Sequence, residues 1–343
     1  MKIIIDAMGG DNAPLEIVKG AIDARNKLGV DIVLVGSGEE ILRSFQSLGL
    51  GNLPDGVSVV NATQVITMED DPAKACREKK DSSMTVALNM LRDGLGDAVV
   101  SAGNTGALLS GATLIVKRIR GIRRAALSPT VPTATGGQAI LLDVGANVDC
   151  TAEYLIQFAF MGSAYAKYAL KLDNPRVGLL NNCAEETNGG KLQKEVYAFL
   201  AEAAKEGKIN FIGNVEGSDV LSGKADVVVT DGFTGNVMLK SLEGMASFFM
   251  SELKSIFYGS TKNKIAALAI KKDFKALKNK LSVGGSIMLG ICKPVVKAHG
   301  SSKAADICAA VEQAFAVASS DTMEEINKRL EDMKVPEAQT NMA

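Results

Sequence analysis

The chain has 343 residues with a formal net charge of −1, and only 5% of its residues are aromatic, none of them tryptophan. This length can bury a large core, whereas the near-neutral charge and scarce aromatic side chains argue against a nucleic-acid-binding surface. The five cysteines are widely spaced and form no Cys-x-x-Cys pair, which argues against a disulfide framework or structural zinc and favours a reducing cytoplasm.

The N-terminal part of the chain alternates predicted strands with predicted helices. Strands are expected at Lys2–Asp6, 31–35, 57–60 and 98–100. Helices are expected up to about Leu28, at 69–80 and from Ala107, and Ser82 or Ser83 is expected to cap a further helix. The segment Gly36-Ser37-Gly38 matches a dinucleotide-binding fingerprint only in part, because position 41 is isoleucine.

The later part continues this alternation and then changes character. Two prolines predict an irregular connection over 128–137. Strands are then expected at 139–143, 176–180, 209–212 and 225–229, and helices at 152–170, 191–206, 302–318 and 321–333. Strand signals vanish from Thr234 to Leu281, where two long helices, broken near 258–260, are expected.

This order of elements predicts an α/β fold, a three-layer α/β/α sandwich around a mainly parallel sheet. No linker or internal repeat interrupts the chain. We therefore expect one large domain over 1–343, from which a long helical hairpin protrudes at about 236–282.

Four turns rich in glycine and small polar residues follow predicted strands, at 8–11, 101–106, 143–147 and 230–236. Ligands of open α/β sheets bind outside the carboxyl ends of the strands, and helix N-termini favour anions. We therefore expect the four turns to meet at one rim and to bind a small anion, most simply phosphate. The candidate residues for binding phosphate and a thioester are Gly9, Gly10, Asp11, Ser101, Asn104, Thr105, Gly106, Asp143, Asn147, Asp231, Thr234 and Gly235.

The chain offers few groups for covalent or metal chemistry. His299 is the only histidine, no carboxylate cluster has metal-ligand spacing, and Ser301 lacks a nucleophile-elbow context. Because the chain has no evident nucleophile, we expect the substrate to supply it. Phosphate can act in this way, since it needs orientation more than deprotonation. The candidate catalytic residues are His299, Lys297 and Asn236.

Two basic segments indicate binding surfaces. Five of the eight residues of 117–124 are basic, and a solvated helix end or a docking patch for an acidic partner, formed by Arg118, Arg120, Arg123 and Arg124, would explain them. Residues 262–280 hold seven lysines and one aspartate beside an apolar stripe. This pattern predicts a helix that contacts either an anionic membrane surface, through Leu268, Ile270 and Phe274, or a partner subunit.

Seven short motifs, in this order, together resemble one family. They are Asp6-Ala7-Met8-Gly9-Gly10-Asp11, Lys79-Lys80-Asp81-Ser82-Ser83-Met84, Ser101–Leu109, Leu141–Asn147, Phe211–Glu216, Thr230–Asn236 and Lys297–Ser302. From residue 1 to about 320 the chain resembles the bacterial phosphate acyltransferases, which move a fatty acyl chain from acyl carrier protein to inorganic phosphate at the start of phospholipid synthesis.

The resemblance implies a fold like that of isocitrate and isopropylmalate dehydrogenases and phosphotransacetylase. It also implies a cytoplasmic homodimer loosely attached to the membrane through its long helices, without a metal or other cofactor. The chain departs from the family pattern at Asn12, where histidine is common, and at Ala184 and Thr187–Gly189, where Lys191 would replace a family lysine.

Three other functions remain open from the sequence. A phosphotransacetylase that uses acyl-CoA is the near alternative, and a nicotinamide-dependent dehydrogenase of the same fold is the distant one. The missing third glycine after Gly38 and the lack of a carboxylate cluster with metal-ligand spacing weigh against the dehydrogenase. A membrane-associated scaffold without catalysis is the third alternative.

Overall fold

A computed structural model of the chain describes residues 1–260, 263, 270, 272 and 285–334. Within these residues the strands form one 11-stranded sheet in the order β3-β2-β1-β4-β11-β10-β5-β6-β9-β7-β8. Its strands are β1 (Lys2–Asp6), β2 (Asp31–Gly36), β3 (Val57–Asn61), β4 (Ala98–Ser101), β5 (Ala126–Pro132), β6 (Gln138–Leu142), β7 (Val177–Leu180), β8 (Phe211–Val215), β9 (Val227–Val229), β10 (Ser286–Leu289) and β11 (Val295–Lys297).

The sheet reverses direction at its middle. β10 is antiparallel to both β11 and β5, and β6 is antiparallel to β5 but parallel to β9. The strands β3, β2, β1, β4, β11 and β5 therefore run one way, and β10, β6, β9, β7 and β8 run the other way. As a result, the carboxyl ends of β1 and β4 lie at one edge of the sheet, and those of β6 and β9 lie at the opposite edge.

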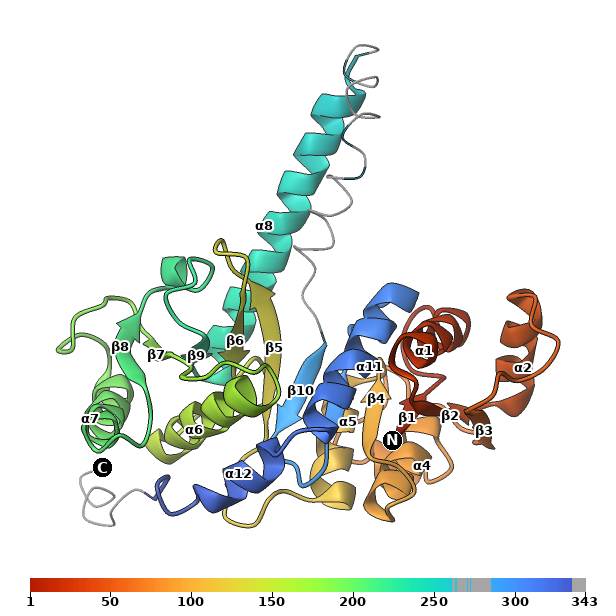
Figure 1. Cartoon of the computed structure of the whole chain (residues 1–343), viewed down its shortest axis with the longest axis horizontal. Helices are drawn as coiled ribbons and strands as arrows, with labels where there is room; N and C mark the ends of the chain where they lie inside the picture. Colours follow the sequence, from red (N-terminus) through yellow and green to blue (C-terminus); the bar gives the residue numbers. More distant parts are fainter. Residues whose placement is uncertain (261–262, 264–269, 271, 273–284, 335–343) are drawn as a thin grey trace.

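Helices cover both faces of the sheet and enclose two apolar clusters, so the predicted α/β/α sandwich is confirmed (Figure 1). One face carries α1 (Leu15–Leu28), α2 (Gly38–Ser47), α6 (Ala152–Tyr168), α7 (Lys191–Lys205), α11 (Ala304–Ala318) and α12 (Thr322–Lys328). The other face carries α3 (Ala75–Glu78), α4 (Ser83–Arg92), α5 (Thr105–Gly111), the π-helical turn η1 (Ala112–Val116), the 3₁₀ turn η2 (Gly217–Asp219) and α8 (Gly232–Tyr258). We call this second face the α5–α8 face.

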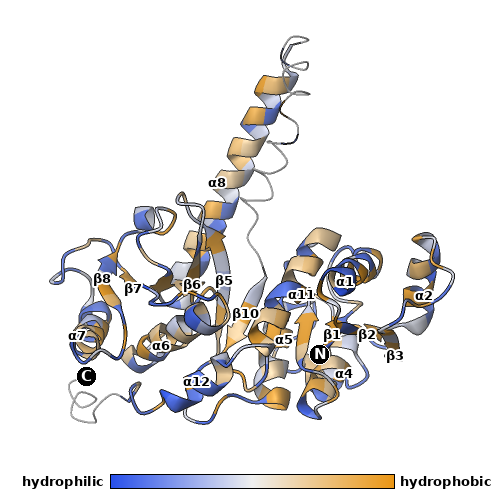
Figure 2. Ribbon diagram, in the orientation of Figure 1, coloured by the Kyte–Doolittle hydropathy of each residue, from blue (hydrophilic) through white to orange (hydrophobic). Residues whose placement is uncertain are grey.

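Helix α8 leaves the body of the molecule as a long single helix (Figure 1). Figure 2 shows hydrophobic residues along its whole length, including the part that projects. Its 27 residues match the first of the two long helices expected after Thr234. The second helix, with Leu268 and Phe274, lies outside the described residues, whereas the Ile270 side chain is 38% exposed. No helix in the described part of the chain is both long and apolar enough to cross a membrane.

Local predictions fail where tertiary pairing outweighs sequence signals. The predicted irregular segment 128–137 is wrong in its first half, because β5 lies between β10 and β6 and pairs with both despite its prolines. The helix expected at 69–80 is only the four-residue α3, since the Asp70 carboxylate binds Lys79 and Thr67 instead of capping a helix. The basic segment 117–124 starts at a helix end, as one of the two alternatives expected, because Lys117 caps η1 with a φ of 75°, and Arg118 then pairs with Ile291.

Candidate functional site

Three polar side chains lie next to one another on neighbouring strands of the α5–α8 face. Asp6 of β1 pairs in register with Ser101 of β4, and Ser101 pairs with Lys297 of β11. Successive side chains of a strand point to opposite faces, so all three share the face of the apolar cluster that holds Ile4, Val99 and Val295. This polar row is buried, with exposed fractions of 1% for Asp6 and Ser101 and 8% for Lys297.

Lys297 is the cation of this row. Its Nζ donates to the carbonyl oxygen of Ala102 at 3.2 Å and to that of Ala298, which leaves one of the three ammonium donors for a ligand. Burial lowers the pKa of Lys297 to about 8, although the negative charges of Asp6 and Asp11 oppose this effect. The ammonium form therefore still dominates at neutral pH, in a place where water is largely excluded.

Asp6 organises the turn that follows β1. Its carboxylate accepts a hydrogen bond from Ser101 Oγ at 2.6 Å and from the Met8 backbone N–H at 3.3 Å. Burial raises the pKa of Asp6, and these hydrogen bonds act against the increase. The turn itself packs closely on its neighbour, since a Cβ on Gly9 would lie 2.6 Å from the Gly103 nitrogen. Glycine is therefore required at position 9 by a close approach of two backbones.

Asn104 begins α5 beside the polar row. Its side-chain oxygen accepts from the Ala107 N–H at 3.1 Å, and its Nδ2 donates to the Thr67 carbonyl oxygen at 3.1 Å. Thr105 and Gly106 occupy the first turn of this helix. Because backbone N–H groups of a first turn have no partner within the helix, they offer donors to an anion.

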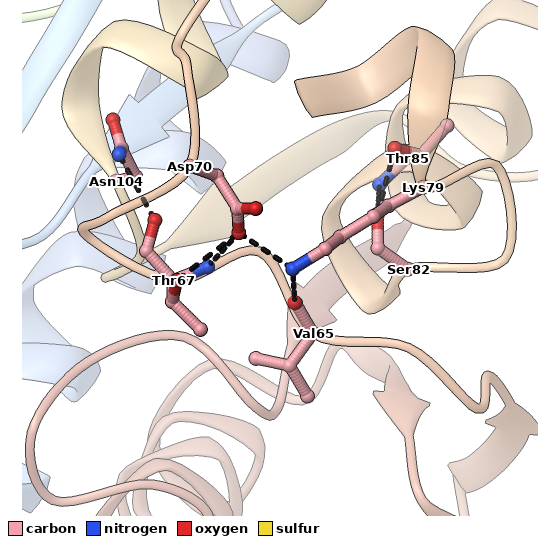
Figure 3. A network of polar contacts seen from close by, with 7 residues as sticks. All are labelled: Val65, Thr67, Asp70, Lys79, Ser82, Thr85 and Asn104. Carbon is pink, nitrogen blue, oxygen red and sulfur yellow. Dashed lines mark hydrogen bonds and ion pairs between the residues drawn. The ribbon is translucent and has the colours of Figure 1, made fainter. Parts of the chain in front are cut away.

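A network of polar contacts supports Asn104 from behind (Figure 3). Lys79 Nζ donates to Asp70 at 2.6 Å and to the Val65 carbonyl oxygen at 2.9 Å, and Asp70 accepts from the Thr67 N–H at 2.7 Å. Ser82 caps α4 by accepting from the Thr85 N–H at 3.2 Å, which confirms the predicted cap. The motif around Lys79 therefore acts here by holding the loop that contacts Asn104.

His299 is exposed and lies at the margin of this group. Its Nδ1 is 2.9 Å from Ser301 Oγ, and the neighbouring Gly300 carbonyl oxygen accepts from the Asp11 N–H at 2.8 Å. Asn12 Nδ2 donates to the carbonyl oxygens of Ser301 and Ser302 at 3.0 and 3.2 Å. Asn12, one of the departures from the family pattern, thus ties the His299 loop to the first turn.

The four turns do not meet at one rim, so that expectation was wrong. Because the sheet reverses at its middle, the structure gathers one group around Gly9, Gly10, Asp11, Ser101, Asn104, Lys297 and His299. A second group, at the opposite edge, holds Asp143, Asn147, Asp231, Thr234, Gly235 and Asn236. Helix α8 connects the two edges, since it starts in the second group and carries Lys240 close enough to Lys297 to lower its pKa.

Asp143 is the centre of the second group. Its buried carboxylate accepts from the N–H groups of Leu127, Val144, Ala146 and Asn147 and from Asn147 Nδ2, at 2.7–3.3 Å. Burial raises the pKa of Asp143, and these bonds oppose the increase. The helix α8 is capped nearby, where Asp231 accepts from the Thr234 N–H and Oγ1, both at 2.8 Å. Asp143 and Asp231 are therefore engaged in ordering the backbone.

The predicted arginine patch divides into residues with different surroundings. Arg118 and Arg124 line a cavity of about 390 Å³ on the α5–α8 face, together with Arg77. Arg123 forms an ion pair with Glu153 at 2.8 Å, and Arg120 is exposed. Lys191, at the start of α7, lies beyond β7 and is not among the residues that surround Lys297.

The sequence motif that contains Asp6 was recognised, but Asp6 itself was not predicted as a site residue. The sequence could have indicated it, because a carboxylate that directly follows a run of buried isoleucines stands at the end of a strand. Lys240 and Arg77 carry no local signal, because only the packing of α8 and α3 brings them to this face. Within the described residues, no group of three or more His, Cys, Asp or Glu side chains is placed to hold a metal ion.

The chain is similar to known proteins over nearly its whole length. Residues 1–325 match the model of the family described as fatty acid synthesis protein. A phosphate acyltransferase of Oceanobacillus iheyensis is 47% identical over 317 residues, with 92% of each chain covered. A phosphate acyltransferase of Thermoanaerobacterium thermosaccharolyticum is 45% identical over 334 residues, which cover 96% of this chain and 97% of the relative.

Solved structures with similar folds have much lower sequence identity. A phosphotransacetylase from Streptococcus pyogenes has a TM-score of 0.66 at 18% identity and covers 93% of this chain and 94% of its own. A 4-hydroxythreonine-4-phosphate dehydrogenase from Klebsiella pneumoniae has a TM-score of 0.55 at 14% identity, over 93% of this chain and 99% of its own. These likenesses support the α/β/α fold expected from the sequence.

Proposed function

Because this chain belongs to the fatty acid synthesis protein family and lies among its phosphate acyltransferases, we propose that the polar row at Lys297 is where it transfers an acyl group. The chain is an acyltransferase that moves an acyl group to phosphate for phospholipid synthesis. The donor that we propose is the thioester of acyl carrier protein, and no metal or other cofactor takes part in the proposed mechanism.

The proposed reaction is a direct displacement. An oxygen of bound inorganic phosphate attacks the thioester carbonyl carbon, the C–S bond breaks, and the carrier leaves as a thiolate that takes up a proton. Two negative centres then need stabilisation: the attacking phosphate and the carbonyl oxygen in the tetrahedral intermediate. Positively charged and N–H donors fixed in a water-poor site stabilise such centres most strongly.

The residues around Lys297 suit these tasks. The ammonium of Lys297 and the N–H groups at Asn104, Thr105 and Gly106 are the proposed donors for phosphate and oxyanion, and the Gly9–Gly10 turn forms the opposite wall. His299, at the margin of this group, is proposed to pass a proton to the departing thiolate. Asn236 and Gly235 lie at the far edge, so we assign them to positioning α8 and Lys240.

The observation that carries this proposal is the buried ammonium of Lys297 beside the capped start of α5. The test is an assay with purified protein, long-chain acyl carrier protein and phosphate, in which acyl phosphate is trapped with hydroxylamine. We expect phosphate-dependent hydroxamate. Replacing the carrier with acyl-CoA separates the phosphotransacetylase alternative, and absence of product with both donors would contradict the proposed reaction.

An apolar cavity offers a place for the acyl chain. It measures about 200 Å³ and lies between the end of β5 and the side of α8, and it is lined by Val131, Pro132, Leu221, Leu242, Met245 and Phe249. Since α8 also carries Lys240 toward Lys297, a chain that enters along this helix would hold its thioester near the polar row. We propose that the acyl chain binds here.

We propose that the arginine-rich segment attracts the acidic carrier protein. Replacing the exposed Arg120 with glutamate is expected to raise the KM for acyl carrier protein roughly fivefold to tenfold at low salt, because charges at the rim of an interface mainly accelerate encounter. The KM should also depend less on salt. Arg43→Glu, on the distant helix α2, serves as the control. Unchanged carrier kinetics for Arg120→Glu would contradict the docking role.

The exposed apolar residues of α8 favour two further interactions. Val237 and Met245 are 51% and 54% exposed near the body, and Ile256 and Tyr258 are 59% and 62% exposed at the tip. Apolar side chains gathered on one exposed element indicate an interaction surface. We propose that the part near the body contacts a second copy of the chain in a homodimer and that the tip rests on an anionic membrane surface.

These two interactions can be separated by substitution. The double variant Ile256→Glu with Tyr258→Glu is expected to lower binding to anionic phospholipid vesicles about tenfold or more in a flotation assay. The reason is that each new carboxylate would lose its hydration when the tip contacts the membrane. The molar mass from light scattering should stay that of the wild type, whereas Val237→Glu should lower it. Vesicle binding that persists in the tip variant would contradict the membrane role of the tip.

A further inference from the structure

The cavity of about 390 Å³ lies apart from the polar row and has a different chemistry. One wall is formed by α5 and η1, which contribute the hydroxyl groups of Ser110 and Thr113. Its lining also includes Arg77 from α3, and Arg118 and Arg124 from the segment that follows η1. Three arginines and two hydroxyl-bearing residues therefore line one cavity.

Unlike several other arginines of the described residues, these three form no ion pair, although Arg124 lies over the Tyr154 ring at 5.6 Å from its centroid. In the described part of the chain, Arg123 is paired with Glu153, and Arg92 with Asp93, but no carboxylate lies within 4.0 Å of Arg77, Arg118 or Arg124. The nearby carboxylate of Asp143 is fully buried and already accepts five hydrogen bonds. The cavity is therefore positively charged, with planar forks that match the oxygens of a phosphate group.

A ligand that binds in this cavity and reacts at the polar row must be long enough to span the distance between them. Asn104 caps the start of α5 beside Lys297, and Ser110 and Thr113 lie six and nine residues further along the same helical segment. At about 1.5 Å per residue the separation along the helix is roughly 9–14 Å. An extended pantetheine arm, at roughly 3.5 Å for every three chain bonds, spans on the order of 15 Å.

We infer that this cavity binds the phosphodiester of the 4′-phosphopantetheine arm that carries the acyl thioester. The inference rests on the proposed function and identifies the part of the donor that the arginines recognise. With the phosphodiester between Arg77, Arg118 and Arg124, the arm follows α5 and brings its sulfur to the Lys297 row. The acyl chain then continues toward the apolar cavity beside α8, so that the donor crosses the α5–α8 face from one edge to the other.

The experiment compares three donors with the same acyl chain: acyl carrier protein, acyl-4′-phosphopantetheine, and acyl-pantetheine, which lacks the phosphate. In Arg77→Gln and Arg118→Gln, kcat/KM for the two phosphorylated donors is expected to fall roughly tenfold or more, as for loss of a charge-assisted hydrogen bond. The value for acyl-pantetheine should stay within about twofold of the wild type. Arg43→Gln, on α2, is the matched control.

A second variant tests the cavity without removing an arginine. Thr113→Glu places a negative charge in the lining of the same cavity and should produce the same selective loss. Equal loss with all three donors, together with a raised KM for inorganic phosphate, would mean that the cavity holds the acceptor phosphate and would overturn the inference. Loss with acyl carrier protein alone would also overturn it, in favour of a contact with the carrier's surface. Failure of the proposed function itself appears differently, as absence of acyl phosphate from the wild type.

Discussion

Replacing Lys297 with methionine is expected to lower kcat for phosphate-dependent acyl transfer by about 10²–10³-fold, the usual cost of removing one donor to a developing oxyanion. Methionine keeps the unbranched chain but has no charge and no donor. The ammonium is 8% exposed and uses the carbonyl oxygens of Ala102 and Ala298 to fix its position, so no water or other cation can readily replace it. Initial rates of trapped acyl phosphate, at saturating donor and phosphate, measure the effect.

The pH dependence of this activity provides a second readout. If the charged form of Lys297 is required, kcat should fall as the pH rises through about 8, the pKa to which burial lowers this group. Lys297→Arg should retain part of the activity and move that fall to higher pH, because a guanidinium stays protonated. A methionine variant with wild-type kcat would contradict the assignment of Lys297 to the reaction.

The stability of the protein should also depend on the protonation of Lys297. Urea unfolding at several pH values measures this dependence and also shows whether the methionine variant is folded. The pKa of Lys297 is about 8 in the folded protein, against 10.5 for a lysine that is not buried, so the unfolded chain binds more protons between these values. The wild type should therefore gain stability as the pH rises through this window. The contribution of Lys297 is absent from the methionine variant, so its unfolding free energy, measured with urea, should rise less over the same range.

Replacing Gly235 with alanine should destabilise the fold by about 3 kcal/mol or more, at the upper end of the range for overpacking. A Cβ at this position would lie 1.9 Å from the Asp143 carbonyl oxygen, and this oxygen cannot easily move aside because it belongs to the backbone. The start of α8 would have to move away from the Asp143 turn, and Lys240 would move with it. Urea unfolding and the acyl phosphate assay should therefore both report a large loss.

Gly244 provides the control for this change within the same helix. It is exposed, and a Cβ there would meet no atom within 4 Å. Gly244→Ala should therefore leave activity unchanged and raise the free energy of unfolding by roughly 0.5–1 kcal/mol, through the higher helix propensity of alanine. If Gly235→Ala behaved like Gly244→Ala, the close contact between α8 and the Asp143 turn would not be required for the fold.

The sequence predicted the elements of this fold more reliably than their arrangement. Buried runs such as Ile3–Ile5 and Val227–Val229 identify strands by composition, and glycine or small polar residues identify the turns after them. The direction of a strand within the sheet has no such local signature. β5 and β10 reverse the sheet through pairing between segments more than 150 residues apart, so the four turns could be recognised but not assigned to their edges.

The candidate site shows the same limit. Lys297 was recognisable because it ends a strand beside the only histidine, and the Asn104 turn because it opens a helix. Arg77 could not be grouped with Arg118 and Arg124, since about 40 residues separate them and α3 is only four residues long. Residues that act through tertiary proximity, such as Lys240 beside Lys297, become visible only once helices are placed on the sheet.

Helix α8 runs without interruption from the body of the molecule to its projecting end. Its 27 residues form one helix, about 40 Å long at 1.5 Å per residue. The N-terminus of this helix is held by the Asp231 cap and by the contact of Gly235 with Asp143. Lys240 lies roughly a third of the way along this helix, close enough to Lys297 to lower its pKa, and the tip lies well outside the body. Because the helix is continuous, a force on its projecting end would be transmitted along it to the segment that carries Lys240.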